Sequence, residues 1–144
     1  MRLVTAGERS PAYENVSNVV QTGFVADAAR WDLLRGAVAL VNPSVHESLS
    51  LVLLESWTVS IPVIVHAHCD VTTEHVRASH GGIAVDFATS EHAAATIAQC
   101  FRSESDRRAM GARGAAYAAA SCSWDRVLDA YERVARAARA SEPS

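Results

Sequence analysis

Short apolar runs alternate with amphipathic stretches over about the first hundred residues of the chain. The clearest run, 37–41, is apolar throughout and has the length of a strand that a parallel sheet buries on both faces. Pro43 ends this run, and an apolar helical stretch follows it before Pro62. The alternation predicts strands over residues 2–6, 18–23, 37–41, 62–65 and 83–86, and helices over residues 27–35, 50–58, 72–79 and 90–102.

Strands that alternate with helices predict an α/β fold, in which a Rossmann-like parallel sheet carries helices on both faces. The pattern then becomes wholly helical: Ser103 and Asp106 resemble a capping box, and Ser123 opens the last helix. Apolar side chains that we expect to pack recur along that helix at Trp124, Val127, Leu128, Tyr131 and Val134. We expect one domain over residues 1–137 and a disordered tail over residues 138–144.

The composition is that of a globular protein, and it limits the classes of binding partner to be considered. The formal charge of −3 gives no support to nucleic-acid binding, and all thirteen basic residues are arginine. No apolar run reaches the roughly 18 residues of a membrane span, and no signal peptide is recognised. Three widely spaced cysteines favour free thiols. We therefore expect a cytoplasmic location.

One loop gathers side chains of the types that bind metals. They are His66, His68, Cys69, Asp70, Glu74 and His75. The residue types suit zinc, but their spacing matches no known zinc pattern. A polar surface loop is the better interpretation, and we expect no metal.

Two carboxylates flank the turn between the strand ending near Pro43 and the helix that follows. Glu47 and Glu55 are eight positions apart, which in an ideal helix means a rotation of about 80° and a rise of about 12 Å. A nucleotide sugar is of similar size. Glu47 could accept hydroxyl protons from the sugar, and Glu55 could bind the paired hydroxyls of a ribose.

The start of the helix between these two carboxylates offers an anion site. The amides of Leu49, Ser50 and Leu51 could bind a diphosphate without any basic side chain, and Ser48 or Ser50 could cap the helix. There is also a simpler interpretation. An acid at a helix start is often only a dipole partner, and an acid within a helix usually faces water. For either glutamate alone that interpretation is preferred, although apolar neighbours favour a partner for Glu55.

The ordered motifs resemble the donor domain of the family 4 retaining glycosyltransferases, which have the GT-B fold. The matching segments are Pro43-Ser44, Glu47, Glu55, 61–65, 81–85, 108–111 and Ser123-Trp124. The resemblance covers nearly the whole chain and implies an incomplete GT-B donor domain that uses a nucleoside-diphosphate sugar and no cofactor. It implies that Glu47 is catalytic, with reaction on one face of the sugar and the leaving phosphate helping to deprotonate the acceptor. It also implies that Val25, with Phe24 beside it, covers the nucleotide base. Phe24 is as readily interpreted as a core residue.

The chain departs from the family pattern in two respects. Ser48, Ser50 and Ser60 stand where the family commonly has glycine, so Ser60 is strained if its φ is positive. The chain contains no lysine, whereas the family supplies an Arg and a Lys to the diphosphate from an earlier strand-helix unit. We expect that unit and the acceptor-binding N-terminal domain to lie outside this chain, with any peripheral membrane association through that domain. The fragment alone is then expected to be inactive.

Two other functions remain open at this stage. One is a nucleotide-sugar epimerase of the same fold. The other is a non-enzymatic relic or partner-binding module, in which the sheet persists without the chemistry.

Overall fold

The computed structural model describes residues 2–140, apart from the side chain of Cys100. Two compact units divide the chain, Met1–Ala37 and Val38–Ser144. None of the helices formed by the described residues is both long enough and apolar enough to cross a membrane.

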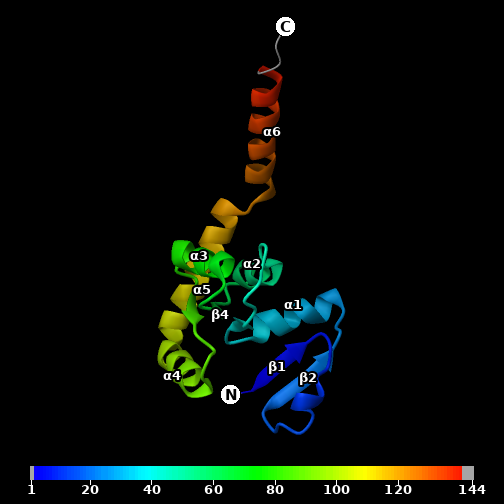
Figure 1. Ribbon diagram of the computed structural model, residues 1–144, viewed down its shortest axis with the longest axis vertical. Helices are drawn as coiled ribbons and strands as arrows, with labels where there is room; N and C mark the ends of the chain where they lie inside the picture. Colours follow the sequence, from blue (N-terminus) through cyan, green and yellow to red (C-terminus); the bar gives the residue numbers. More distant parts are fainter. Residues whose placement is uncertain (1, 141–144) are drawn as a thin grey trace. The chain divides into compact units, whose positions relative to one another are not determined.

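The first unit is a pair of parallel strands followed by a helix (Figure 1). Its elements are β1 (Leu3–Ala6), the 3-10 helix η1 (Pro11–Tyr13), β2 (Val19–Gly23) and α1 (Asp27–Gly36). Leu3 pairs with Val19, and the Thr22 hydroxyl donates to the Thr5 carbonyl oxygen over 3.0 Å. The predicted strands and helix of this unit are confirmed to within one residue at each end.

The second unit is built on a three-stranded parallel sheet of order β3-β4-β5. The strands are β3 (Leu40–Asn42), β4 (Val63–His66) and β5 (Gly82–Val85). The helices are α2 (Leu51–Thr58), α3 (Asp70–Ser79), α4 (Ser90–Cys100), α5 (Glu104–Ser121) and α6 (Trp124–Ala140). The strand predicted over 37–41 begins only at Leu40, because its neighbour β4 begins at Val63 and the Leu40 amide makes the first bond, to the Pro62 carbonyl oxygen.

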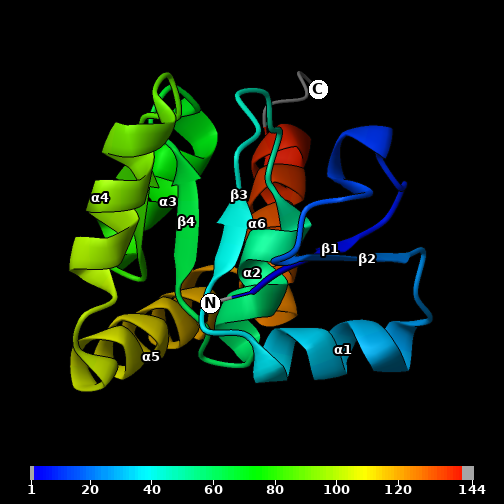
Figure 2. The ribbon, with the colours of Figure 1, turned by 90° about the horizontal axis from the view of Figure 1, so that it is seen from below.

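Helices cover both faces of this sheet (Figure 2). On one face Val63 and Val65 of β4 join a core cluster with Leu53 and Trp57 of α2, Val76 of α3 and Ala118 of α5. On the other face Ile64 and Val85 pack with Ala93 of α4. Successive residues of β4 point to opposite faces, so a strand buried on both sides must be apolar throughout. The predicted α/β architecture is confirmed.

Trp57 organises the first of these clusters. It is fully buried, and its indole Nε1 donates to the Gly81 carbonyl oxygen over 2.9 Å. The edge-on rings of Tyr117 and His75 lie 5.7 and 6.4 Å from it. Gly81 and Gly114 lie so close to the indole that neither position has room for a Cβ atom. Glycine at position 114 is therefore what lets α5 approach α2.

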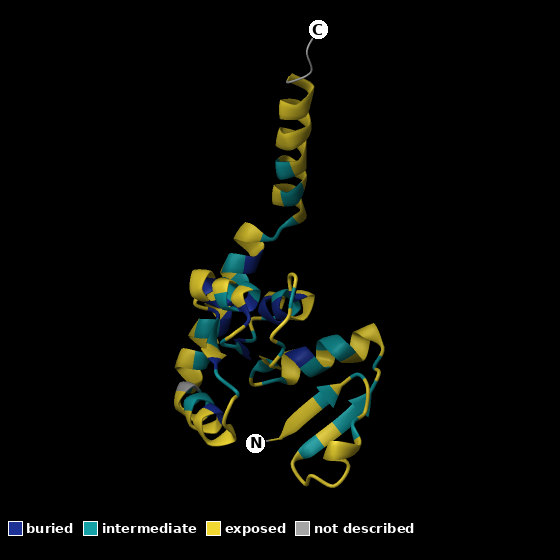
Figure 3. Cartoon of the chain, in the orientation of Figure 1, coloured by how far each residue is buried: buried dark blue, intermediate teal, exposed yellow. Residues whose placement is uncertain are grey.

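The C-terminal helices begin where the sequence places them. The Ser103 hydroxyl accepts a hydrogen bond from the Asp106 amide over 3.2 Å, as the capping signature predicts. α6 continues to Ala140, so residues 138–140 of the predicted disordered tail are helical, while residues 141–144 lie outside the described residues. None of the residues of α6 is buried, and Figure 3 shows the helix almost wholly in the exposed colour.

Candidate functional site

Asn42, the last residue of β3, organises the loop at the carboxyl end of that strand. Its side-chain Nδ2 donates to Glu47 Oε1 and to Ser50 Oγ, each over 2.9 Å. Its Oδ1 accepts a bond from the Ser44 amide over 3.1 Å. One neutral amide therefore fixes the course of the loop, the Glu47 carboxylate and the residue before α2. Sequence analysis did not identify Asn42, although a lone polar residue at the end of an apolar strand was a signal for it.

Glu47 is half-buried and held by Asn42 in front of α2. A carboxylate held at one oxygen by a single donor keeps lone pairs that can accept further hydrogen bonds. Such a group can bind the hydroxyls of a sugar at the carboxyl edge of a parallel sheet, where ligands of these folds bind.

The helix start differs from the predicted cap. Ser50 precedes α2 with φ 62° and ψ 72°, and its side chain makes no capping bond. The predicted cap at Ser50 is wrong, because a cap requires extended backbone and this left-handed residue directs its hydroxyl toward Asn42 instead. Ser48 is exposed and lies three residues before Leu51, the first residue of the helix. Its predicted capping role is not seen either.

The backbone amides predicted to bind a diphosphate come just before the first hydrogen bond of α2. The first bond of the helix runs from the Leu53 amide to the Ser50 carbonyl oxygen over 3.0 Å. The amides of Leu49, Ser50 and Leu51 come before that bond, and Leu49 and Leu51 are exposed. Amides at a helix start carry partial positive charge, so this segment is suited to a phosphate.

Glu55 lies in the second turn of α2 and is half-buried. Two of its apolar neighbours in the sequence, Leu53 and Trp57, are fully buried in the core cluster. Their positions are four residues apart and share one face of the helix, whereas a residue midway between them projects elsewhere. Leu53 and Trp57 therefore project away from the Glu55 side chain. Its predicted binding of ribose stays a prediction.

Val25 and Phe24, predicted to meet the base, belong to the first unit. They follow Gly23, whose φ of 75° turns the chain at the end of β2. Val25 is half-buried, but Phe24 is 88% exposed, which excludes its interpretation as a core residue. An exposed aromatic ring at the end of a strand is consistent with stacking on a base.

The histidine-rich loop after β4 is organised by hydrogen bonds. His66 Nδ1 accepts a bond from the His68 amide over 3.1 Å, so a neutral His66 ring carries its proton on Nε2. His68 Nε2 lies 3.6 Å from Asp86 Oδ2. A hydrogen bond from the Ala88 amide, and to a lesser extent His68, lowers the pKa of Asp86. Among the described residues, no group of three or more His, Cys, Asp or Glu side chains is placed to hold a metal ion.

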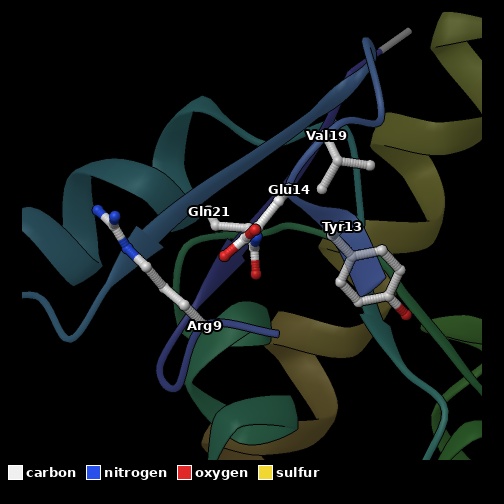
Figure 4. A pocket seen from close by; sticks show the side chains of 5 residues that line it. All are labelled: Arg9, Tyr13, Glu14, Val19 and Gln21. Carbon is white, nitrogen blue, oxygen red and sulfur yellow. The ribbon is translucent and has the colours of Figure 1, made fainter. Parts of the chain in front are cut away.

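A separate hollow of about 240 Å³ lies in the first unit. Figure 4 shows Arg9 and Tyr13 on opposite sides of it, with Glu14 and Gln21 between them and Val19 on the side of Tyr13. Gln21 exchanges two hydrogen bonds with the backbone of Ser10, over 2.7 and 3.1 Å. This hollow contains none of the residues predicted to bind a ligand.

Solved structures that share the fold of this chain include three glycosyltransferase-type proteins. They are WaaG, a glycosyltransferase involved in lipopolysaccharide biosynthesis, sucrose-phosphate synthase from Thermosynechococcus elongatus, and HepE from Anabaena in complex with UDP and glucose. WaaG is 22% identical with a TM-score of 0.68, over 81% of this chain and 33% of its own. Sucrose-phosphate synthase is 20% identical with a TM-score of 0.78, and the match covers 97% of this chain and 38% of that protein. HepE is 19% identical with a TM-score of 0.68, and the match covers 90% of this chain and 33% of that protein.

The chain thus spans about a third of the length of these proteins, and the likeness shows the Rossmann-like architecture of GT-B glycosyltransferases. No curated protein matches the sequence significantly. The family described as glycosyl transferases group 1 matches residues 4–117, which include both strand units and the Glu47 loop. Because this match covers most of the chain, the protein belongs to the glycosyl transferases group 1 family.

Proposed function

We propose that this chain is the donor-binding half of a retaining glycosyltransferase, which transfers a sugar from a nucleoside diphosphate to an acceptor hydroxyl. The observation that carries the proposal is the arrangement in front of α2. Asn42 holds the Glu47 carboxylate 2.9 Å away, and the amides of Leu49, Ser50 and Leu51 precede the first bond of the helix. This arrangement supports the proposal because a carboxylate suited to sugar hydroxyls lies beside helix-start amides suited to a phosphate, at the carboxyl edge of the sheet.

In the proposed reaction, the bond between the anomeric carbon and the phosphate oxygen breaks, and its electron pair leaves with the phosphate. The acceptor hydroxyl forms the new bond on the same face and passes its proton to the departing phosphate. Glu47 accepts a hydrogen bond from the sugar, and this bond strengthens as the sugar becomes cationic. The helix-start amides stabilise the charge that develops on the phosphate.

Glu55 is assigned to the ribose hydroxyls of the donor. It is half-buried in the second turn of α2, the helix that follows the proposed phosphate site. The ribose does not change during the reaction, so Glu55 contributes binding that is equal in the ground state and the transition state. HepE was solved with UDP and glucose, which supports a nucleotide-sugar donor for a chain of this fold.

Calorimetry with UDP and UDP-glucose on the 144-residue chain tests these roles. Glu55→Gln should weaken binding of both ligands, because both contain the ribose. Glu47→Gln should weaken UDP-glucose and leave UDP unchanged, because only UDP-glucose carries the sugar. Loss of a hydrogen bond to a charged group corresponds to about 1.5–3 kcal/mol, or roughly 10- to 150-fold in affinity.

Glu91→Gln is the matched control, since Glu91 is an exposed acid in the first turn of another helix, α4. It should change neither affinity. If Glu47→Gln weakened both ligands equally, Glu47 would not be a sugar-binding residue. Absence of UDP binding to the parent chain at millimolar concentration would contradict the proposed donor site.

A further inference from the structure

The carboxyl ends of β1 and β2 are joined by hydrogen bonds that continue past the paired strands. The Gly7 amide donates to the Gly23 carbonyl oxygen over 2.9 Å, and the Thr22 hydroxyl donates to the Thr5 carbonyl oxygen over 3.0 Å. Ligands of parallel sheets bind beyond the carboxyl ends of the strands. The residues that follow β1 and β2 are therefore held together at an edge that is suited to a ligand.

Arg9 extends its guanidinium group along this edge. Its Nε lies 3.5 Å from the position that a Cβ atom on Gly23 would occupy, and its Nη2 lies 4.0 Å from it. Figure 4 shows the side chain turned away from Tyr13, toward the end of β2. A side chain at position 23 would meet the guanidinium group, so glycine leaves it room. Arg9 is exposed and forms no ion pair with another described residue.

Phe24 follows Gly23 directly, and its ring is 88% exposed. Arg9 and Phe24 thus both adjoin the same glycine, within one compact unit. An aromatic ring and a guanidinium group offer the two contacts by which proteins hold a nucleotide base, stacking on its face and hydrogen bonds to its edge. Stacking discriminates little, because every base has a π face. A choice between bases at this edge therefore falls to Arg9.

The guanidinium group of Arg9 donates hydrogen bonds and accepts none. The edge of a base that it contacts must therefore present acceptors. Uracil presents its O4 carbonyl oxygen, and guanine presents O6 together with N7, whereas cytosine and adenine carry an amino group at the corresponding position. A guanidinium group against an amino group would place donor against donor and leave both without a partner.

We propose that Arg9 selects a donor nucleotide whose base carries a carbonyl oxygen at this position, as uracil and guanine do, and that Phe24 stacks on the same base. This inference rests on the proposed nucleotide-sugar donor and adds to it the class of base. Arg9 contributes specificity, because its contact exists only with a carbonyl base. Phe24 contributes affinity for any base.

NMR titrations of the 144-residue chain with UDP, CDP, GDP and ADP test this inference. UDP should bind about tenfold more tightly than CDP, and GDP about tenfold more tightly than ADP, because a hydrogen bond to a charged group is gained in each case. The tighter of UDP and GDP identifies the base.

Two substitutions separate the roles of the side chains. Arg9→Met keeps a long side chain without donors, so both preferences should fall to about twofold or less. Phe24→Ala should weaken all four nucleotides about tenfold and keep the preferences, because it removes stacking alone.

Arg2→Met is the matched control, since Arg2 is also exposed but precedes β1, at the opposite end of that strand. It should change neither the affinities nor the preferences. Pyrophosphate has no base, so its affinity should be the same for the parent chain and for Arg9→Met. Far-ultraviolet circular dichroism should show the same helix content in all variants.

Three results would overturn the role of Arg9 and leave the proposed donor site standing. They are equal binding of UDP and CDP and of GDP and ADP by the parent chain, preferences that survive Arg9→Met, and weaker pyrophosphate binding by Arg9→Met, which would make Arg9 a phosphate contact. Failure of the parent chain to bind any of the four nucleotides at millimolar concentration would overturn both proposals.

Discussion

Two serines occupy backbone conformations that usually require glycine. Ser50 and Ser60 have φ values of 62° and 59°, in the left-handed region that glycine adopts without strain. Both stand where the resembling family commonly has glycine. Ser50 is 6% exposed, and its hydroxyl accepts the Asn42 hydrogen bond that also helps to fix the loop. Ser60 is exposed, so its backbone strain has no such compensation in the site.

Substitution by glycine should therefore change the free energy of unfolding in opposite directions at these two positions. Ser60→Gly should raise the free energy of unfolding by about 0.5–1 kcal/mol, because it removes left-handed strain at an exposed position. Ser50→Gly removes the same strain but also the buried partner of Asn42, which costs about 1–3 kcal/mol, so it should destabilise. Urea unfolding of both variants measures this. A change of the same sign in both would mean that the Asn42 bond contributes nothing to stability.

At this scale the sequence revealed the residue types but not their contacts. Glu47 could be singled out because its spacing from Glu55 and Pro43 is a linear pattern. The role of Asn42 depends on where a loop of eight residues returns to its strand, which no local pattern encodes. The cap expected at Ser50 failed for a related reason, since the left-handed backbone of one residue redirected its hydroxyl.

At the scale of elements, the close approach of α2 and α5 depends on two glycines of α5, which have no side chain to separate the helices. Gly114 of α5 faces the indole of Trp57, and Gly111 faces the Ser60 carbonyl oxygen. The alternation of apolar runs with amphipathic stretches was enough to predict the order of the strands and helices, because strands buried on both faces are continuously apolar and the helices between them are amphipathic. It could not predict this contact, since glycine in a helix pattern signals only a cost in propensity.

Gly114→Ala should destabilise the second unit by about 1–3 kcal/mol, because the added methyl group must displace the buried Trp57 ring. Gly36→Ala is the control, since Gly36 also lies in a helix but has no atom within 4 Å of the added Cβ. There the better helix propensity of alanine should leave stability equal or slightly higher. Thermal unfolding followed by tryptophan fluorescence would distinguish the two. Equal melting temperatures would show that α5 can move away from α2 without cost.

At the scale of the whole molecule, the two units differ in how deeply their strands are buried. Val63, Ile64 and Val65 of β4 are at most 2% exposed, with packed clusters on both faces. In the first unit, Leu3 and Val4 of β1 are 45% and 44% exposed. Strands that bury little apolar surface open at a small cost in free energy, so the units should differ in local stability.

Amide hydrogen exchange should therefore show two levels of protection. Amides of β4 should exchange at least about 100-fold more slowly than those of β1, equivalent to about 2.7 kcal/mol in opening free energy. A chain that begins at Val38 should keep the protection of β4, because both clusters that cover this strand lie within the second unit. Exchange measured by NMR on both chains tests this. Equal protection of β1 and β4, or loss of β4 protection on removing residues 1–37, would show that the two units open as one.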